Sequence, residues 1–277
     1  MNLLQNFLLK IIFVLFFSII IEFNSQSLTV SYELISRPNP DEKDNLKTQN
    51  YVLDIFENKS IFRTEMRKES DSLLNKTGFG LQYYLDPNHE VYFTKDLNKH
   101  LFTKGFVSPM SRDHFFIKIT DELVWKISAE TALISNFNCQ KAEVQYGGRN
   151  WTAWFTKDIP ISEGPYYFHG LPGLIIQVKD NDGDYVFNAL EIKKLKNKSL
   201  YEVQSGTEIA WSQYKKILQD FFDSPYNFAK AKGMKVVQDN GSGGTKEIDY
   251  RQRTWETQMM LLNKNNPIEL NHKINFK

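Results

Sequence analysis

Residues 174–192 read LIIQVKDNDGDYVFNALEI and form the clearest hairpin pattern in this chain of 277 residues. Two apolar runs, 174–179 and 185–192, flank five polar residues, and Asp182-Gly183 supplies the positive-φ step that a tight antiparallel turn prefers. The five polar residues also look like the start of a calcium loop, but Ala189 stands where that loop needs a bidentate Glu. The stretch therefore predicts two paired strands and no metal site.

Short apolar and aromatic runs, separated by turn residues, continue from this hairpin back to residue 28. The aromatic share of the whole chain is 14%, with 21 Phe and 13 Tyr, and such residues favour strands over helices. So many strands need a curved or closed sheet, because a flat sheet leaves exposed edges and an uncovered face. The other predicted strands are 28–34, 51–56, 61–66, 90–94, 100–107, 114–119, 124–128, 140–146 and 150–156.

The pattern changes after Gly206. Residues 208–222 place apolar side chains three and four positions apart, which is typical of one face of a helix, and residues 247–262 repeat that spacing with Trp255, Met259 and Leu262. Between them, residues 240–244 (NGSGG) indicate a loop. We therefore expect a mainly β chain, with an antiparallel curved sheet or half-open barrel and one or two C-terminal helices packed on it.

The N-terminus carries a targeting pattern. Lys10 precedes an apolar run at 11–21, and small residues follow, which is the order found in secretory signal peptides. The run is shorter than the roughly 18 to 20 residues needed to span a membrane, which favours a cleaved signal over a retained anchor. We expect a signal peptide over residues 1–27, cleaved after Ser25 or Ser27, and a single domain over residues 28–277. The protein is then exported, periplasmic or outer-membrane associated, with no integral membrane span after cleavage.

Charge and cysteine content exclude several classes of protein. With 34 Lys and Arg against 33 Asp and Glu, the net charge of +1 gives no global attraction to nucleic acid. A single cysteine excludes an intramolecular disulfide and thiolate-rich metal clusters. The five His are far apart, and nucleophile-elbow, phosphate-loop and zinc-helix motifs are missing from the sequence, so we expect no metal and no cofactor. One local excess, nine Lys against four acidic residues in 193–235, fits either an anionic membrane or ordinary solvated faces.

The most distinctive segment runs from residue 139 to residue 174. Cys139 is interpreted either as a buried structural thiol or as a reactive thiol beside Lys141. Alternation in 150–156 puts Trp154 on the face opposite Trp151, and Pro172-Gly173 fits the centre of a type II turn. The loop from Gly164 to Leu174, which contains this turn, is either a rigid aromatic closure of the core or a surface for a ligand or partner. The candidate binding residues are Cys139, Arg149, Trp154, Tyr167, His169, Pro172 and Gly173.

Residues 170–175 read GLPGLI, and the chain resembles the exported, largely uncharacterised GLPGLI family of Bacteroidota, which is named after this hexapeptide. The resemblance implies a signal peptide and an association with outer-membrane transport components, near which such proteins are often encoded. No catalytic residues are established for the family, so none carries over. Other matching segments are Cys139 to Ala142, Gly148-Arg149, Trp151 to Thr156, Ile159-Pro160, Gly164-Pro165 and Asn266 to Leu270.

These observations favour a non-enzymatic binding or accessory protein of the cell envelope. It either holds an apolar ligand in its aromatic interior or docks on an outer-membrane transport protein. The alternative is an exported enzyme of unknown reaction that uses Cys139, Arg149 or His169.

Overall fold

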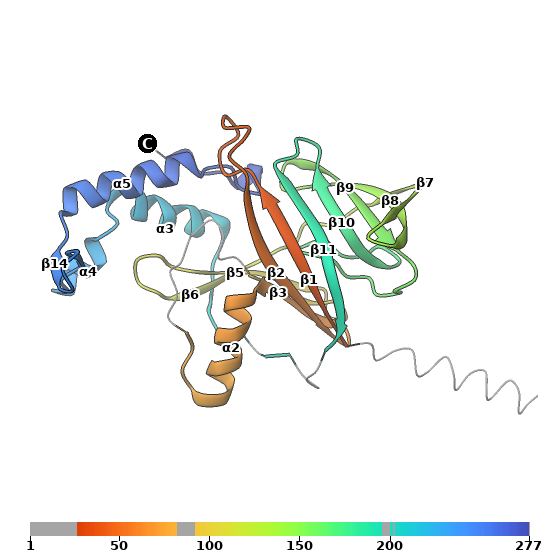
Figure 1. Cartoon of the computed structure of the whole chain (residues 1–277), viewed down its shortest axis with the longest axis horizontal. Helices are drawn as coiled ribbons and strands as arrows, with labels where there is room; N and C mark the ends of the chain where they lie inside the picture. The colour runs from red at the N-terminus through yellow and green to blue at the C-terminus, as the bar shows by residue number, and fades with distance from the viewer. Residues whose placement is uncertain (1–26, 82–91, 196–199, 202, 277) are drawn as a thin grey trace, which may run out of the picture.

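The computed structural model describes residues 27–81, 92–195, 200–201 and 203–276, so the expected signal peptide lies outside the described residues except for Ser27. The main feature is one large sheet in the order β12-β6-β5-β4-β3-β2-β1-β11-β10-β9-β8-β7 (Figure 1). The two ends of that order, β12 and β7, do not pair, so the sheet is curved but not closed into a barrel. The predicted fold class, mainly β with C-terminal helices, is confirmed.

Neighbouring strands of this sheet pair in the antiparallel sense, except that β12 pairs with β6 in parallel. The hairpin read from residues 174–192 is present as β10 and β11. The strands are β1 (Leu28–Ser36), β2 (Lys47–Phe56), β3 (Lys59–Thr64), β4 (Tyr92–Asp96), β5 (Leu101–Val107), β6 (His114–Lys118), β7 (Lys126–Ile134), β8 (Phe137–Tyr146), β9 (Arg149–Thr156), β10 (Leu174–Asp180), β11 (Tyr185–Lys194) and β12 (Thr207–Glu208).

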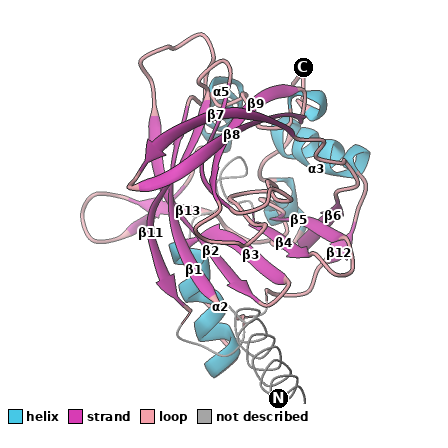
Figure 2. Cartoon of the chain, turned by 90° about the vertical axis from the view of Figure 1, so that its right-hand side faces the viewer, coloured by secondary structure: helices cyan, strands magenta, loops and turns pink. Residues whose placement is uncertain are grey.

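The core lies on the concave side of the sheet, where the loop between β9 and β10 fills the space. Tyr166, Tyr167, Phe168 and Leu171 of this loop are all buried. Tyr166 packs against Phe93 of β4 with ring centroids 4.4 Å apart, so the loop reaches across to the other half of the sheet. Figure 2 shows the sheet curving around loop segments rather than around an empty space. The excess of aromatic residues is therefore used largely to pack this interior.

Helix α2 (Glu65–Thr77) was not predicted, and the predicted strand 61–66 is wrong at its end because β3 stops at Thr64. The Thr64 side chain accepts a hydrogen bond from the Arg67 backbone N–H and caps the helix, and Gly78, with φ of +80°, ends it. The buried residues of this helix are Arg67, Ser70 and Asp71. Because these inward-facing residues are polar, a search for apolar residues at helical spacing could not find this helix.

The C-terminal third forms an arm beside the sheet (Figure 1). Helices α3 (Trp211–Asp223) and α5 (Tyr250–Asn263) confirm the two predicted helices and pack on each other, and Gln258 donates to the Phe222 carbonyl at 3.0 Å. The predicted loop 240–244 joins two short strands. No helix among the described residues is long and apolar enough to cross a membrane. The remaining elements are α4 (Asn227–Ala231), β13 (Val237–Asp239), β14 (Thr245–Glu247) and the 3-10 turn η2 (Leu270–His272).

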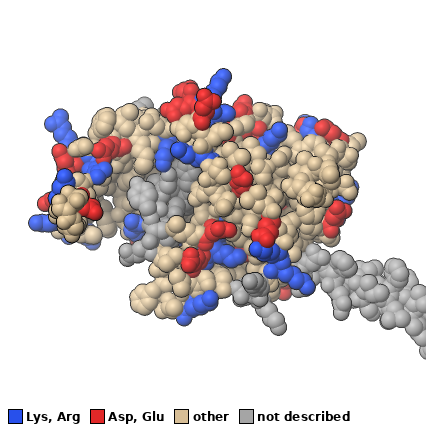
Figure 3. Space-filling view, viewed as in Figure 1, with Lys and Arg blue, Asp and Glu red and all other residues tan. Residues whose placement is uncertain are grey.

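Acidic and basic side chains are interspersed over the face shown in Figure 3, in keeping with the nearly balanced charge of the chain.

Candidate functional site

Cys139 lies on β8 opposite Thr156 of β9 and is buried, with 1% of its surface exposed. Burial raises the pKa of its thiol to about 11. The thiolate is the nucleophilic form of cysteine, so this thiol is unreactive near neutral pH. This placement agrees with the structural interpretation of Cys139.

Arg149 lies at the other end of the same pair of strands, beside Tyr146. It is seven residues along β9 from the partner of Cys139, or about 23 Å at the usual strand rise. Its guanidinium donates to Asp180 at 2.7 Å, to Asp184 at 3.0 Å and to Asn266 at 2.6 Å. The carbonyls of Pro267 and Ile268 accept its remaining hydrogen bonds. Arg149 thus clamps the segment after α5 onto the sheet.

Trp154 is on the outer face of the sheet, since its neighbours on either side, Ala153 and Phe155, both point into the core with 0% exposure. Tyr167 and His169 lie instead in the interior loop. The His169 ring packs 4.3 Å from the Phe102 ring, and burial, followed by the charge of Lys95, lowers its pKa to about 4. The structure therefore brings the Tyr167 and His169 rings together, with centroids 5.1 Å apart, whereas Trp154 lies on the other face of the sheet.

Pro172 and Gly173 do not form the expected type II turn. Gly173 has a φ of +157°, and its N–H donates to the Leu171 carbonyl at 2.8 Å, so the turn closes over three residues. A Cβ at Gly173 would lie 2.0 Å from the Thr156 carbonyl oxygen. This glycine is required by the close approach of the loop to the end of β9.

The interior of the sheet has little free space. A cavity of about 50 Å³ opens among the aromatic residues beside Lys104 and Glu269. That is room for one or two water molecules. The aromatic interior is consequently a packed core.

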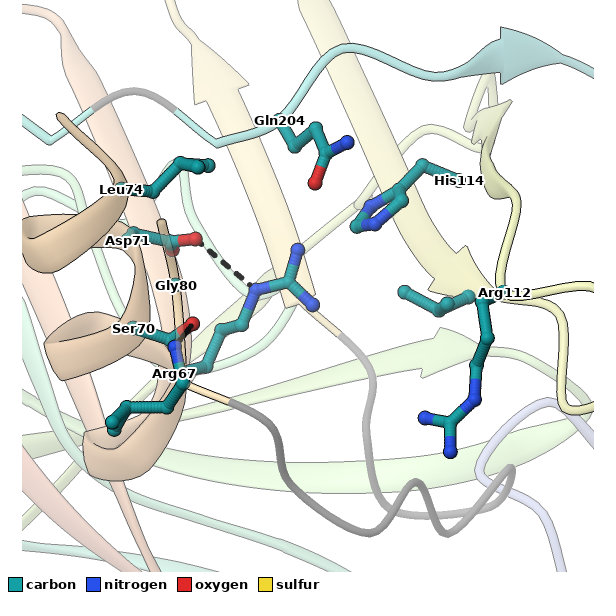
Figure 4. Close-up of a pocket in the computed structure, with 10 residues that line it drawn as sticks. Arg67, Ser70, Asp71, Leu74, Gly80, Arg112, His114 and Gln204 are labelled. Carbon is teal, nitrogen blue, oxygen red and sulfur yellow. Dashed lines mark hydrogen bonds and ion pairs between the residues drawn. The ribbon is translucent and has the colours of Figure 1, made fainter. Parts of the chain in front are cut away.

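A larger recess of about 400 Å³, which we call the α2 recess, lies outside that core. Its walls come from α2, the segment after α2, the β5–β6 hairpin and the segment before β12. Figure 4 shows the Arg67 guanidinium, the His114 ring and the Gln204 amide pointing into the same space, whereas the Arg112 guanidinium points away from its centre. The lining residues are Arg67, Ser70, Asp71, Leu74, Gly80, Leu81, Val107, Arg112, His114 and Gln204.

Arg67 is fixed by its surroundings. Its residue is only 5% exposed, its Nε donates to Asp71 at 3.2 Å, and its guanidinium carbon lies 4.7 Å from the centroid of the Tyr92 ring. An arginine held from several sides loses little further entropy when it binds a ligand. The structure therefore presents a preorganised positive charge to the recess.

His114 and Gln204 supply uncharged polar groups opposite Arg67. The His114 Nδ1 is buried without a hydrogen-bond partner among the described residues. Burial, and then the nearby Arg67 charge, lower the pKa of His114, so the ring is neutral at pH 7. The Gln204 side chain likewise makes no hydrogen bond within the described part of the chain. A buried polar atom usually has a partner, so the unpartnered His114 Nδ1 indicates a site for a polar ligand, and the exposed Gln204 amide is free to bind the same ligand.

A row of ion pairs between side chains of alternating charge leads to the recess. Lys68 contacts Asp54 at 2.6 Å, Asp54 contacts Arg63 at 3.3 Å, Arg63 contacts Asp71 at 2.6 Å, and Asp71 contacts Arg67. This row contains three positive and two negative side chains, so its net charge is positive. Its last cation, Arg67, faces the recess. This site could not be predicted from the sequence, because nothing in the local sequence connects Arg67, His114 and Gln204.

The comparisons with known proteins give a short family match and a distant structural likeness. Residues 146–177 match a family described as "Protein of unknown function (Porph_ging)". Two crystal forms of PNGF-II are similar in structure, each at 16% identity over 70% of this chain, with TM-scores of 0.49 and 0.47. This chain spans about a third of the length of those chains, 33% in both cases. The search of curated proteins gave no match.

Proposed function

We propose that this protein is an exported, non-catalytic binding protein of the cell envelope that holds a small acidic molecule in the α2 recess. The observation that carries the proposal is the convergence of Arg67, His114 and Gln204 on one recess of about 400 Å³ (Figure 4). A concave site with a few converging polar groups is the usual form of a small-molecule site.

The donor chemistry favours a carboxylate. Arg67 supplies a fixed positive charge, the Gln204 amide supplies N–H donors, and neutral His114 supplies one N–H. Hydrogen bonds from such donors to an ionised oxygen are shorter and stronger than those between neutral groups. Leu74, Leu81 and Val107 provide apolar wall for the remainder of a small organic acid.

The packed interior supports a ligand site outside the core. The 50 Å³ cavity among the interior aromatics is too small for an apolar ligand, whereas the α2 recess has the volume of a small-molecule site. The residues considered for an enzyme also occupy positions that favour structural roles. Cys139 is buried with a raised pKa, Arg149 is fully used as a clamp, and His169 is packed among aromatic rings.

The export and the family assignment belong to the same proposal. The signal-peptide pattern of residues 1–27 supports a periplasmic or outer-membrane-associated protein. The hexapeptide at 170–175 lies inside the matched segment 146–177, which supports membership of the GLPGLI family. An outer-membrane transport protein then remains the proposed partner that receives or delivers the ligand.

Isothermal titration with succinate, and with its neutral diamide succinamide, tests the proposed binding. We expect succinate to bind and succinamide to bind at least tenfold more weakly, because the diamide lacks the charge that Arg67 recognises. Gln204→Ala should weaken succinate binding by about tenfold. Gln145→Ala is the matched control, since Gln145 is exposed on β8 and outside the recess. Absence of succinate binding, or equal binding by both probes, contradicts the proposal.

A further inference from the structure

Large apolar side chains lie exposed in a row along one face of α5. Trp255 is 61% exposed, Met259 38% and Leu262 45%. Their spacing of four and three residues puts them on the same side of the helix, and exposed Arg251, four residues before Trp255, extends the row. We call these four residues the α5 row.

The opposite side of α5 is attached to the rest of the molecule. Leu261 is 2% exposed, and Arg253 donates to Gln238 of β13 at 3.1 Å. The α5 row therefore points away from the contacts that hold the helix. The apolar spacing that predicts α5 marks its exposed face and not a core face.

The part of the chain that carries this row is basic. Residues 227–264 contain seven Lys and Arg against four Asp and Glu, although the whole chain has a net charge of only +1. Lys230, Lys232, Lys235 and Lys246 are exposed, and Figure 3 shows Lys and Arg side chains projecting from this end of the molecule. Residues 227–264, which include the α5 row, therefore carry a net charge of +3, from seven basic and four acidic residues.

We infer that the α5 row docks this end of the protein on an anionic lipid surface. A helix that exposes Trp and aliphatic side chains next to basic residues adsorbs at the interface between water and lipid, with the apolar side chains inserted at the headgroup level. Each Lys or Arg near an anionic surface adds further attraction. The same charges disfavour a second copy as the occupant, because two basic arms would then face each other.

Vesicle flotation of residues 28–277, which contain every strand and helix of the described residues, tests this inference. Vesicles of phosphatidylglycerol and phosphatidylcholine in equal parts are compared with vesicles of phosphatidylcholine alone. We expect the protein to float with the anionic vesicles, to stay behind with the neutral ones, and to dissociate as salt is raised. The triple variant Trp255→Ser, Met259→Ser, Leu262→Ser should lower the bound fraction at least tenfold.

The matched control is the variant Leu133→Ser, Leu190→Ser. These leucines are 69% and 57% exposed on the sheet, outside the arm, and their replacement should leave flotation unchanged. Circular dichroism is used to check that both variants fold. The inference is overturned if the wild type does not float with anionic vesicles or if the triple variant floats as well as the wild type. It is also overturned if light scattering finds a dimer that the triple variant abolishes, because the row is then a protein interface.

Discussion

Lys104 and Glu269 lie 165 positions apart in the sequence and form an ion pair of 2.6 Å inside the molecule. The Tyr146 and Tyr166 hydroxyls donate to the other oxygen of Glu269, at 2.9 and 2.7 Å. These four residues join β5, β8, the interior loop and the segment after α5. The end of the chain is thus built into the core of the sheet.

Replacement of Glu269 should destabilise the fold in a pH-dependent way. Burial alone would raise the pKa of this carboxyl, but the Lys104 charge and the hydrogen bonds from Lys104, Tyr166 and Tyr146 outweigh it and hold the pKa below 4.5. The stabilisation is therefore complete above the unfolded-state pKa and is lost as pH falls through the lower, folded-state pKa. At pH 7, Glu269→Gln should lower the free energy of unfolding by about 3 to 5 kcal/mol, because Lys104 remains buried without its counter-charge.

Urea unfolding of wild type and variant at several acidic and neutral pH values measures both effects. The exposed pair Lys216 and Asp220 provides the control, and Asp220→Asn should cost less than about 1 kcal/mol. The wild type should lose more of its free energy of unfolding than Glu269→Gln as the pH is lowered. If both proteins lose the same amount, the Glu269 carboxylate is not charged in the folded protein.

Replacement of Gly173 should also be costly. In Gly173→Ala the new methyl group meets the Thr156 carbonyl oxygen at 2.0 Å, and the atom it meets is backbone, which cannot rotate aside. We expect a loss of about 3 kcal/mol from this overpacking. Gly183→Ala is the control because its Cβ meets nothing within 4 Å, so only its positive φ of +68° costs stability, about 1 kcal/mol. Equal losses in thermal unfolding of the two variants would contradict the close approach.

The Cys139 thiol should be almost inert in the folded protein. Its pKa of about 11 leaves very little thiolate at pH 8, and its side chain is buried. Labelling with a thiol-specific disulfide reagent should be slow under native conditions and complete within minutes in denaturant. Rapid labelling of the native protein would revive the enzyme hypothesis based on this cysteine.

The sheet could be predicted from the sequence because its signals are local. Residues 174–192 contain both strands and the turn between them, and most other strands follow the same pattern. Helix α2 escaped prediction because Arg67, Ser70 and Asp71 face inward where apolar residues were expected. The need for glycine at position 173 could not be predicted either, because only the folded loop brings this residue close to Thr156.

The candidate site was less accessible to sequence reasoning. Arg67, His114 and Gln204 come from three separate segments, and His114 was noted only as one of five isolated histidines. The residues that were proposed from the sequence, such as Arg149 and His169, are distinctive because they hold the core together. Their contacts are with other parts of the fold.

Nuclear magnetic resonance of the histidine ring nitrogens during a succinate titration tests the central claim most directly. The proposed ligand lies against His114, whose Nδ1 lacks a partner among the described residues. Its resonances, assigned with His114→Ala, should shift and saturate with the dissociation constant found by calorimetry, while those of half-buried His169, which lies in the interior loop, stay constant. His114 signals that do not move at saturating succinate would contradict the account.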